Sequence, residues 1–190
     1  MEASINWNIE KNWAIENIPG TTLLYTDMNS QAFSYILPLI RAAGGLSLSQ
    51  ICTITGLEGS TIQNWVKRGW VGDMKRSKKY NERQVARILI LNALRGSLQL
   101  DSIAHLLTYT SGVDGDLVNE GDLFSFMCDA AKNVGLNITN AEAIIEQLLA
   151  DYTGGEERKN RLSKTLPIMV YACVCADLQQ TANLRLMELV

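Results

Sequence analysis

Apolar and polar residues alternate along the chain with a period that predicts helices over most of its length. The first clear case starts near Ser30, where apolar residues recur three or four positions apart: Phe33, Ile36, Leu37 and Ile40. This spacing places them on one face of a helix. Pro38 predicts a bend or a boundary in that helix, and Gly44-Gly45 predicts its end.

Two short helices joined by a tight turn are predicted next. Ser47 and Gln50 have the spacing of a capping box, in which each residue's side chain bonds to the other's backbone N–H. The helix that follows is short, because Gly56 is expected to end it. Cys52 is a small residue at a point where the two helices must approach closely.

The second of these helices is predicted to run from about Gly59 to Arg68. Three apolar residues share one side and are expected to be buried: Leu57, Ile62 and Val66. The outer side then carries Ser60, Thr61, Gln63, Asn64 and Lys67. Amide side chains can pair with adenine in the major groove, while Lys and hydroxyl groups hold the DNA backbone. An ordinary polar helix face is the alternative interpretation.

A basic loop follows this helix. Trp70-Val71 and Lys79-Tyr80 are expected to form two very short antiparallel strands around it. The tip carries four cations within five positions: Lys75, Arg76, Lys78 and Lys79. Such a tip repels itself unless it meets opposite charge, as a wing does on a phosphate backbone. Lysines at a sheet edge also prevent aggregation, so a purely protective role is the alternative.

Helical patterns continue to the C-terminus. Asn81 and Gln84 form a second predicted capping box, and another helix is expected after Gln99. Three helices are predicted beyond a glycine-rich loop: one over 122–134, one opened by a capping box at Thr139, and one from Ser163 to about Met187. Glu156 to Arg161 is predicted to be a loop. Residues 166–174 are apolar nearly all round, which predicts burial in a core or a subunit interface.

Composition supports a globular helical protein, and charge adds a candidate partner. Apolar residues make up 47% of the 190 residues, with 3 prolines. Residues 67–95 carry nine basic side chains against Asp73 and Glu82, a net +7, although the whole chain carries −3. An acidic protein that gathers its positive charge in one window often presents that window to a polyanion. A solvated basic loop remains the alternative.

The sequence offers no chemistry of an enzyme. It has no nucleophile–base pair, no glycine loop for phosphates and no set of metal ligands. Asp114 and Asp116 have carboxylate spacing, but the rest of a calcium loop is missing. The four scattered cysteines predict reduced thiols, and neither a secretory signal nor a membrane span is predicted. We therefore expect a cytoplasmic protein that is not an enzyme, without cofactor, metal or membrane partner.

Residues 56–107 resemble the MerR-type helix-turn-helix domain. The run from Thr61 to Val71 matches the family's recognition helix and its turn into the wing, and residues 79–88 and 97–107 resemble the two helices that follow. Residues 24–80 are also similar to an uncharacterised bacterial family of MerR-like proteins, known as a domain of unknown function. Gln63 and Asn64 stand where MerR proteins usually carry Arg and Tyr. A compact helical segment is expected in place of their long C-terminal dimer helix.

Together these features predict a mainly α protein with a MerR-like winged helix-turn-helix and a small β-hairpin wing. The predicted parts are an N-terminal arm (1–30), the winged domain (31–108) and a C-terminal helical region (119–190) for dimerisation or effector binding. The predicted function is transcription regulation by a homodimer on double-stranded DNA, with an unidentified small-molecule or protein effector. The alternative is an adaptor or antirepressor that reuses this fold. The candidate DNA contacts are Ser60, Thr61, Gln63, Asn64, Lys67, Arg68, Lys75, Arg76, Lys78, Lys79, Tyr80, Arg83 and Arg87.

Overall fold

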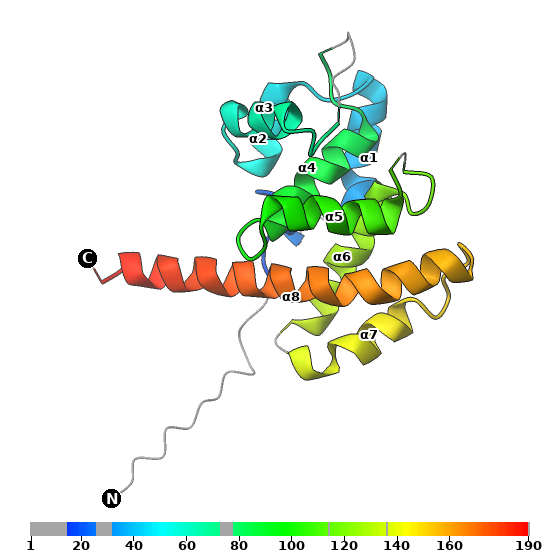
Figure 1. The fold of residues 1–190 in the computed structure, drawn as a ribbon. Helices are drawn as coiled ribbons and strands as arrows, with labels where there is room; N and C mark the ends of the chain where they lie inside the picture. Colours follow the sequence, from blue (N-terminus) through cyan, green and yellow to red (C-terminus); the bar gives the residue numbers. More distant parts are fainter. Residues whose placement is uncertain (1–14, 26–31, 73–77, 114, 136, 190) are drawn as a thin grey trace, which may run out of the picture.

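The computed structural model describes residues 15–25, 32–72, 78–113, 115–135 and 137–189 (Figure 1). Within these residues all regular secondary structure is helical, apart from two isolated β-bridges. The elements are α1 (Ala32–Ala43), α2 (Leu48–Thr55), α3 (Gly59–Lys67), α4 (Glu82–Leu94), α5 (Leu100–Ser111), α6 (Glu120–Val134), a short 3-10 helix η3 (Ile138–Asn140), α7 (Ala141–Leu148) and α8 (Glu156–Met187). The mainly α class is therefore confirmed.

Local capping starts two of these helices where the sequence predicts. The Ser47 hydroxyl accepts a hydrogen bond from the backbone N–H of Gln50, and the Gln50 side chain accepts one from the backbone N–H of Ser47. Asn81 and Gln84 make the same reciprocal pair at the start of α4. Both capping boxes are confirmed, because each needs only residues three apart in the chain.

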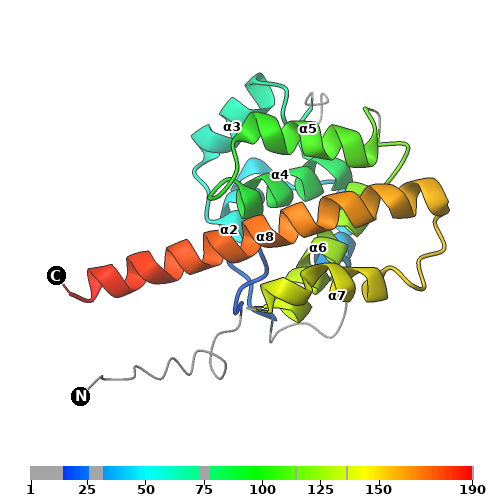
Figure 2. The ribbon, with the colours of Figure 1, turned by 60° about the horizontal axis from the view of Figure 1, so that its bottom comes forward.

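Helix α4 lies at the centre of the molecule. Nine of its residues are buried, on nearly every side of the helix. They can be buried all round because α4 packs against α1, α2, α5, α6 and α8. One hydrophobic cluster runs through these elements, from Ile15 to Val174. The two short helices α2 and α3 therefore sit on a core that they share with the C-terminal helices (Figures 1 and 2).

The prediction of a β-hairpin wing from the sequence is wrong. The residues described contain no strand, only two isolated bridges, Asn17 with Leu24 and Leu46 with Tyr80. Tyr80 exchanges backbone hydrogen bonds of 2.8 and 2.9 Å with Leu46, so it does not pair with Trp70-Val71. Val71 and Tyr80 are each 3% exposed. Burial of these two side chains in the core outweighs the pairing of two very short strands.

The last helix is longer than predicted, with 32 residues. It begins at Glu156 and not at Ser163, so the charged stretch expected as a loop is its first turns. Two acidic residues at a helix start are favoured by the helix dipole, and Glu157 pairs with Arg161 one turn later. Residues 178–189 are all exposed, and this end of α8 projects beyond the body (Figures 1 and 2). The C-terminal region therefore has the three packed helices expected from the sequence, α6, α7 and α8, and in addition a projecting end of α8 that the sequence did not predict.

The helix predicted to open with a capping box at Thr139 starts differently. The short helix η3 precedes α7, and Asn140 at the start of α7 makes no side-chain cap. The Thr139 hydroxyl instead bonds to the Asn137 side chain. Among the described residues, no helix is both long enough and apolar enough to cross a membrane.

Candidate nucleic-acid interface

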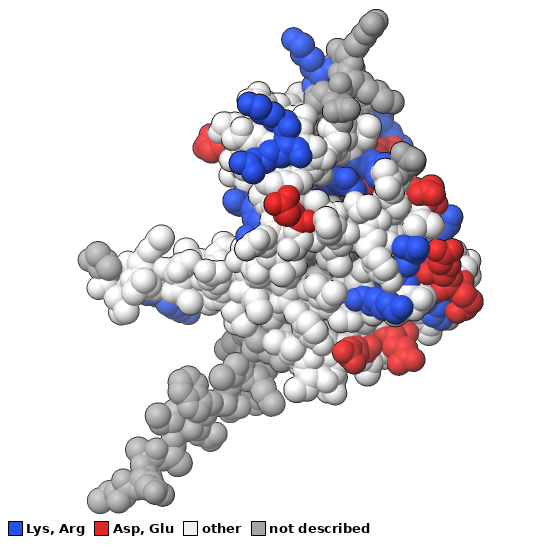
Figure 3. All heavy atoms as spheres, viewed as in Figure 1, with Lys and Arg blue, Asp and Glu red and all other residues white. Residues whose placement is uncertain are grey.

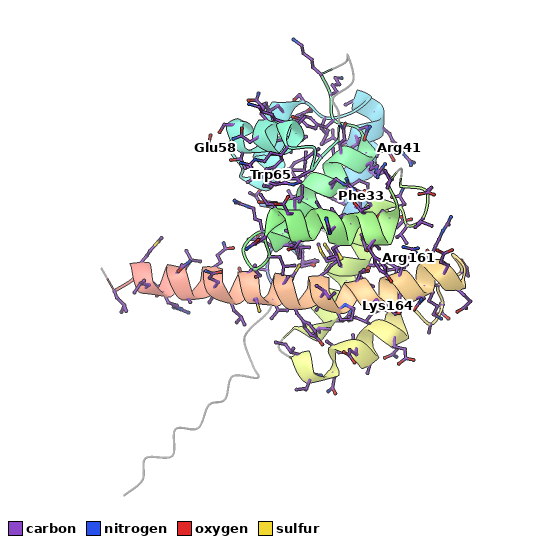
Figure 4. The ribbon with its side chains drawn as sticks, viewed as in Figure 1. Phe33, Arg41, Glu58, Trp65, Arg161 and Lys164 are labelled. Atoms are coloured by element: carbon purple, nitrogen blue, oxygen red, sulfur yellow. The ribbon has the colours of Figure 1, made fainter. Side chains whose placement is uncertain are left out.

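Helices α2 and α3 are joined by a three-residue turn, 56–58, in the manner of a helix-turn-helix. Gly56 ends α2 in the left-handed conformation, with φ at 69°. Ile62 and Trp65 anchor α3, with 0% and 3% exposure. Figure 4 shows Trp65 on the inner side of α3 and Glu58 at its outer start. Sequence reasoning missed Trp65 as an anchor and expected Val66, which is only half-buried.

The opposite side of α3 is polar and exposed. Ser60, Gln63, Asn64, Lys67 and Arg68 are exposed, and Thr61 is half-buried. Within the described residues, the side chains of Ser60, Gln63 and Asn64 make no hydrogen bond to other protein groups. Their donors and acceptors are thus available to an external partner.

Trp70 holds the Arg68 side chain beside the exposed face of α3. The Arg68 guanidinium lies over the Trp70 ring, 5.2 Å from its centroid. The Trp70 indole N–H donates a 2.9 Å hydrogen bond to the Asp101 carboxylate at the start of α5. Arg68 is thereby restrained at the end of α3, with its charge in solvent. Sequence reasoning treated Trp70 as a strand residue, and the distance to Asp101 along the chain concealed this contact.

The basic segment after α3 is only partly described. Lys78 is exposed, whereas Tyr80 is buried and does not reach the surface. The Lys79 ammonium donates a 2.5 Å hydrogen bond to the carbonyl of Ala43, which ties the segment to the end of α1. Lys75 and Arg76 lie outside the described residues. Figure 3 shows Lys and Arg side chains over α3 and beside the segment 78–80, at the same end of the molecule.

Two further candidate cations are paired with a buried carboxylate. The Glu120 side chain is fully buried and contacts Arg83 at 3.1 Å and Arg87 at 2.6 Å. Arg87 has a side chain only 12% exposed, and Arg83 also donates to the carbonyl of Val113. These arginines join α4 to the start of α6, so the structure places them away from the α3 face. Nothing in the local sequence identifies Glu120 as their partner, because it lies 33 and 37 positions away.

Sequence comparison bears on the middle of the chain. Residues 43–120 match the family described as "Domain of unknown function (DUF1836)". Searches among curated proteins and among solved structures gave no match. The matched region begins at the end of α1 and ends at Glu120, so it contains the α3 face, the basic segment and the whole Arg83–Arg87–Glu120 group. Residues 43–120 are thus similar to a domain of unknown function, DUF1836.

Proposed function

We propose that this protein regulates transcription by binding double-stranded DNA through α3. The observation that carries the proposal is the exposed face of α3, whose polar side chains have no partner among the described residues and are flanked by cations. An α-helix fits the major groove, where amide side chains can distinguish base pairs. Gln63 and Asn64 would contact base edges.

The flanking cations would supply the phosphate contacts. Lys67 and Arg68 end α3, and Lys78 follows in the basic segment. Lys75 and Arg76 lie between them in the chain and add to the positive charge. Arg83 and Arg87 are held by Glu120 between α4 and α6, and Tyr80 is buried, so these three residues are not included in the proposed interface.

We further propose that the regulator is a homodimer that pairs through α8. Apolar residues recur three or four positions apart along its solvent-facing side: Ile168, Tyr171, Cys175, Leu178, Ala182 and Leu186. We call this set the outer stripe. It contains no charged residue and extends over about 27 Å at 1.5 Å per residue. Apolar spacing of this kind suits a seam between two helices, and a second copy offers a matching seam.

Selection of bound sequences from random duplex DNA, with the purified full chain, tests the proposal directly. A helix-turn-helix dimer should enrich a palindrome with two half-sites. Absence of any enriched sequence would favour a protein-interaction adaptor over a DNA-binding regulator.

The salt dependence of binding to an enriched site tests the phosphate contacts. If about six phosphates are neutralised, log affinity should fall against log salt with a slope near −5. The double variant Lys67→Ala, Arg68→Ala should flatten that slope by about 1.8, because two contacts are lost. Lys159→Ala, Lys164→Ala provides a charge-matched control, since both residues belong to the first turns of α8, and Figure 4 shows Lys164 away from α3. Equal slopes for both double variants would exclude Lys67 and Arg68 from the interface.

A further inference from the structure

A cavity of about 920 Å³ lies between three parts of the chain that are far apart in sequence. Its walls are the N-terminal segment 15–22, the end of α4 and the second half of α8. The α4 and α8 walls meet closely at one edge, because a side chain on Gly96 would contact the Ala176 side chain at 3.2 Å. A volume of this size is in the range of small-molecule sites.

The face of α8 that enters this cavity changes character along the helix. Upstream, Leu166, Met169 and Cys173 point into the core and are buried. The same face continues as Asp177, Gln180 and Leu184, which line the cavity. The face of α8 thus becomes polar where the helix leaves the core, opposite segment 15–22. Its polar side chains are available to a ligand in the cavity.

Two carboxylates without an ion-pair partner line the cavity, one on the N-terminal segment and one on α8. Glu16 and Asp177 both line the cavity and form no ion pair or hydrogen bond through their side chains within the described residues. Burial raises the pKa of Asp177, and the negative charge of Glu16 raises it further. The charge of Glu16 thus acts on Asp177 across the cavity that both residues line.

The two arginines that line the cavity form no ion pair with these two carboxylates. Arg95 donates to the Asn92 side chain at 2.9 Å, and Arg185 pairs with Glu188 at 3.1 Å. Glu16 and Asp177 thus face each other's side of the cavity with no ion-pair partner among the described residues, and a cation placed between them would supply one.

We propose that this cavity binds a small organic cation whose protonated amine lies between Glu16 and Asp177. Gln180 and Thr181 supply further hydrogen-bonding groups beside that position, and Ile15 and Leu184 supply apolar contacts for a short carbon chain. The ligand class is a hydrophilic amine or guanidine, because the lining is rich in polar side chains.

The cavity is connected directly to the helix-turn-helix. Thr22, in its wall, hydrogen-bonds through its side chain to the carbonyls of Thr53 and Ile54 at the end of α2. The Asn92 amide, in the opposite wall, donates both to Gly20 and to Thr55. A ligand that holds segment 15–22 against α8 also holds the end of α2, and hence the orientation of α3. Cation binding is expected to change DNA affinity; this regulatory part rests on the proposed DNA-binding function, whereas the binding site itself does not.

Calorimetric titration of the full chain in amine-free buffer tests the site. The probes are 1,4-diaminobutane and agmatine, and 1,4-butanediol is the neutral control of the same length. We expect both cations to bind with dissociation constants at or below about 1 mM, and the diol to bind at least about tenfold more weakly. Equal binding of diol and diamine, or no binding of either cation, would overturn the proposal.

Variants locate the bound amine. Asp177→Asn and Glu16→Gln should each weaken diamine binding by about tenfold, because each removes one of two charges that contact the ammonium. Glu146→Gln removes an exposed carboxylate from α7 and should leave the affinity unchanged. Diamine binding that is equally strong in all three variants would show that the amine does not lie between Glu16 and Asp177.

A DNA titration with and without diamine then distinguishes cation binding in the cavity from regulation of DNA binding by that cation. Changed DNA affinity in the wild type, but not in Asp177→Asn, supports regulation through the cavity. Diamine binding with unaltered DNA affinity would contradict the regulatory part and leave the site in place. Diamine binding by a protein that binds no DNA would overturn the proposed function, again without affecting the site.

Discussion

At the scale of single residues, Glu120 determines what two arginines do. Its fully buried carboxylate receives hydrogen bonds from Arg83 and Arg87, and all three belong to the contact between α4 and α6. A buried carboxylate is tolerated only when it is paired and hydrogen-bonded. The pairing with Glu120 thus gives two candidate DNA contacts a structural role between α4 and α6.

Replacement of Glu120 by Gln should strongly destabilise the fold. The substitution keeps the shape of the side chain but leaves two arginine charges without their carboxylate, and the Arg87 side chain is only 12% exposed. We expect a loss of about 3–5 kcal/mol in the free energy of unfolding, measured by urea denaturation. Glu142→Gln, on the exposed side of α7, should change it by less than about 0.5 kcal/mol. Equal stability of the two variants would mean that the buried group contributes little.

Asp177 should make stability depend on pH in a predictable direction. Because burial and Glu16 raise its pKa in the folded protein above the ordinary 3.8, the folded state favours the protonated acid. Its stabilising contribution is therefore complete below pH 3.8 and is lost as the pH rises through the folded-state pKa. Asp177→Asn should be more stable than the wild type at pH 7, and this advantage should shrink toward pH 4, in amine-free urea denaturation at both pH values. An advantage that grows toward low pH would contradict the assignment.

At the scale of elements, the N-terminal segment 15–25 acts as a strap between the helix-turn-helix and α4. Its hydrogen bonds reach the end of α2 through Thr22, and its Gly20 carbonyl accepts one from Asn92. Two properties of Gly20 allow segment 15–25 to pack closely against α4. Its φ is +75°, and a side chain at this position would collide with the backbone oxygen of Leu89.

Substitution of Gly20 by Ala should weaken the packing of segment 15–25 against α4. The left-handed backbone costs an alanine about 1–2 kcal/mol, and the collision with α4 adds to that cost. Gly44→Ala is a matched control, because Gly44 also has a positive φ, 63°, but a side chain there would meet no atom within 4 Å. We expect Gly20→Ala to lower the free energy of unfolding clearly more than Gly44→Ala in parallel urea titrations. Equal losses would show that backbone strain, without packing, explains both.

At the scale of the whole molecule, α8 has two roles along its length. Its first half completes the core against α6, α7, α4 and α5, whereas residues 178–189 are exposed beyond it. Exposed apolar side chains gather on this projecting end, and Leu178 and Leu186 belong to the outer stripe. A projecting, partly apolar helix suits the proposed pairing with a second copy.

Charges placed on the outer stripe should separate that dimer. We expect Leu178→Asp, Leu186→Asp to halve the mass measured by sedimentation equilibrium, because two carboxylates per copy would be buried in the seam. Leu184→Asp is the control: this leucine is 55% exposed on the same helix but lies about 200° around from Leu186. A wild type that sediments as a monomer, or a dimer that persists in the double variant, would refute pairing through α8.

The sequence by itself determines the local features of this protein. The caps at Ser47 and Asn81, the turn at Gly56 and the polar outer face of α3 all depend on residues within one or two helical turns of each other. Such interactions can be read along the chain, because the residues that satisfy each other's hydrogen bonds are close in sequence.

Only the tertiary structure decides where side chains with distant partners lie. Tyr80 pairs with Leu46 and not with Trp70, and the arginines of α4 turn inward to Glu120. Glu16 and Asp177 line the same cavity only because α8 packs beside the N-terminal segment. In each case the deciding partner is more than thirty positions away, and the free energy of burying or pairing the group depends on packing that no local pattern specifies.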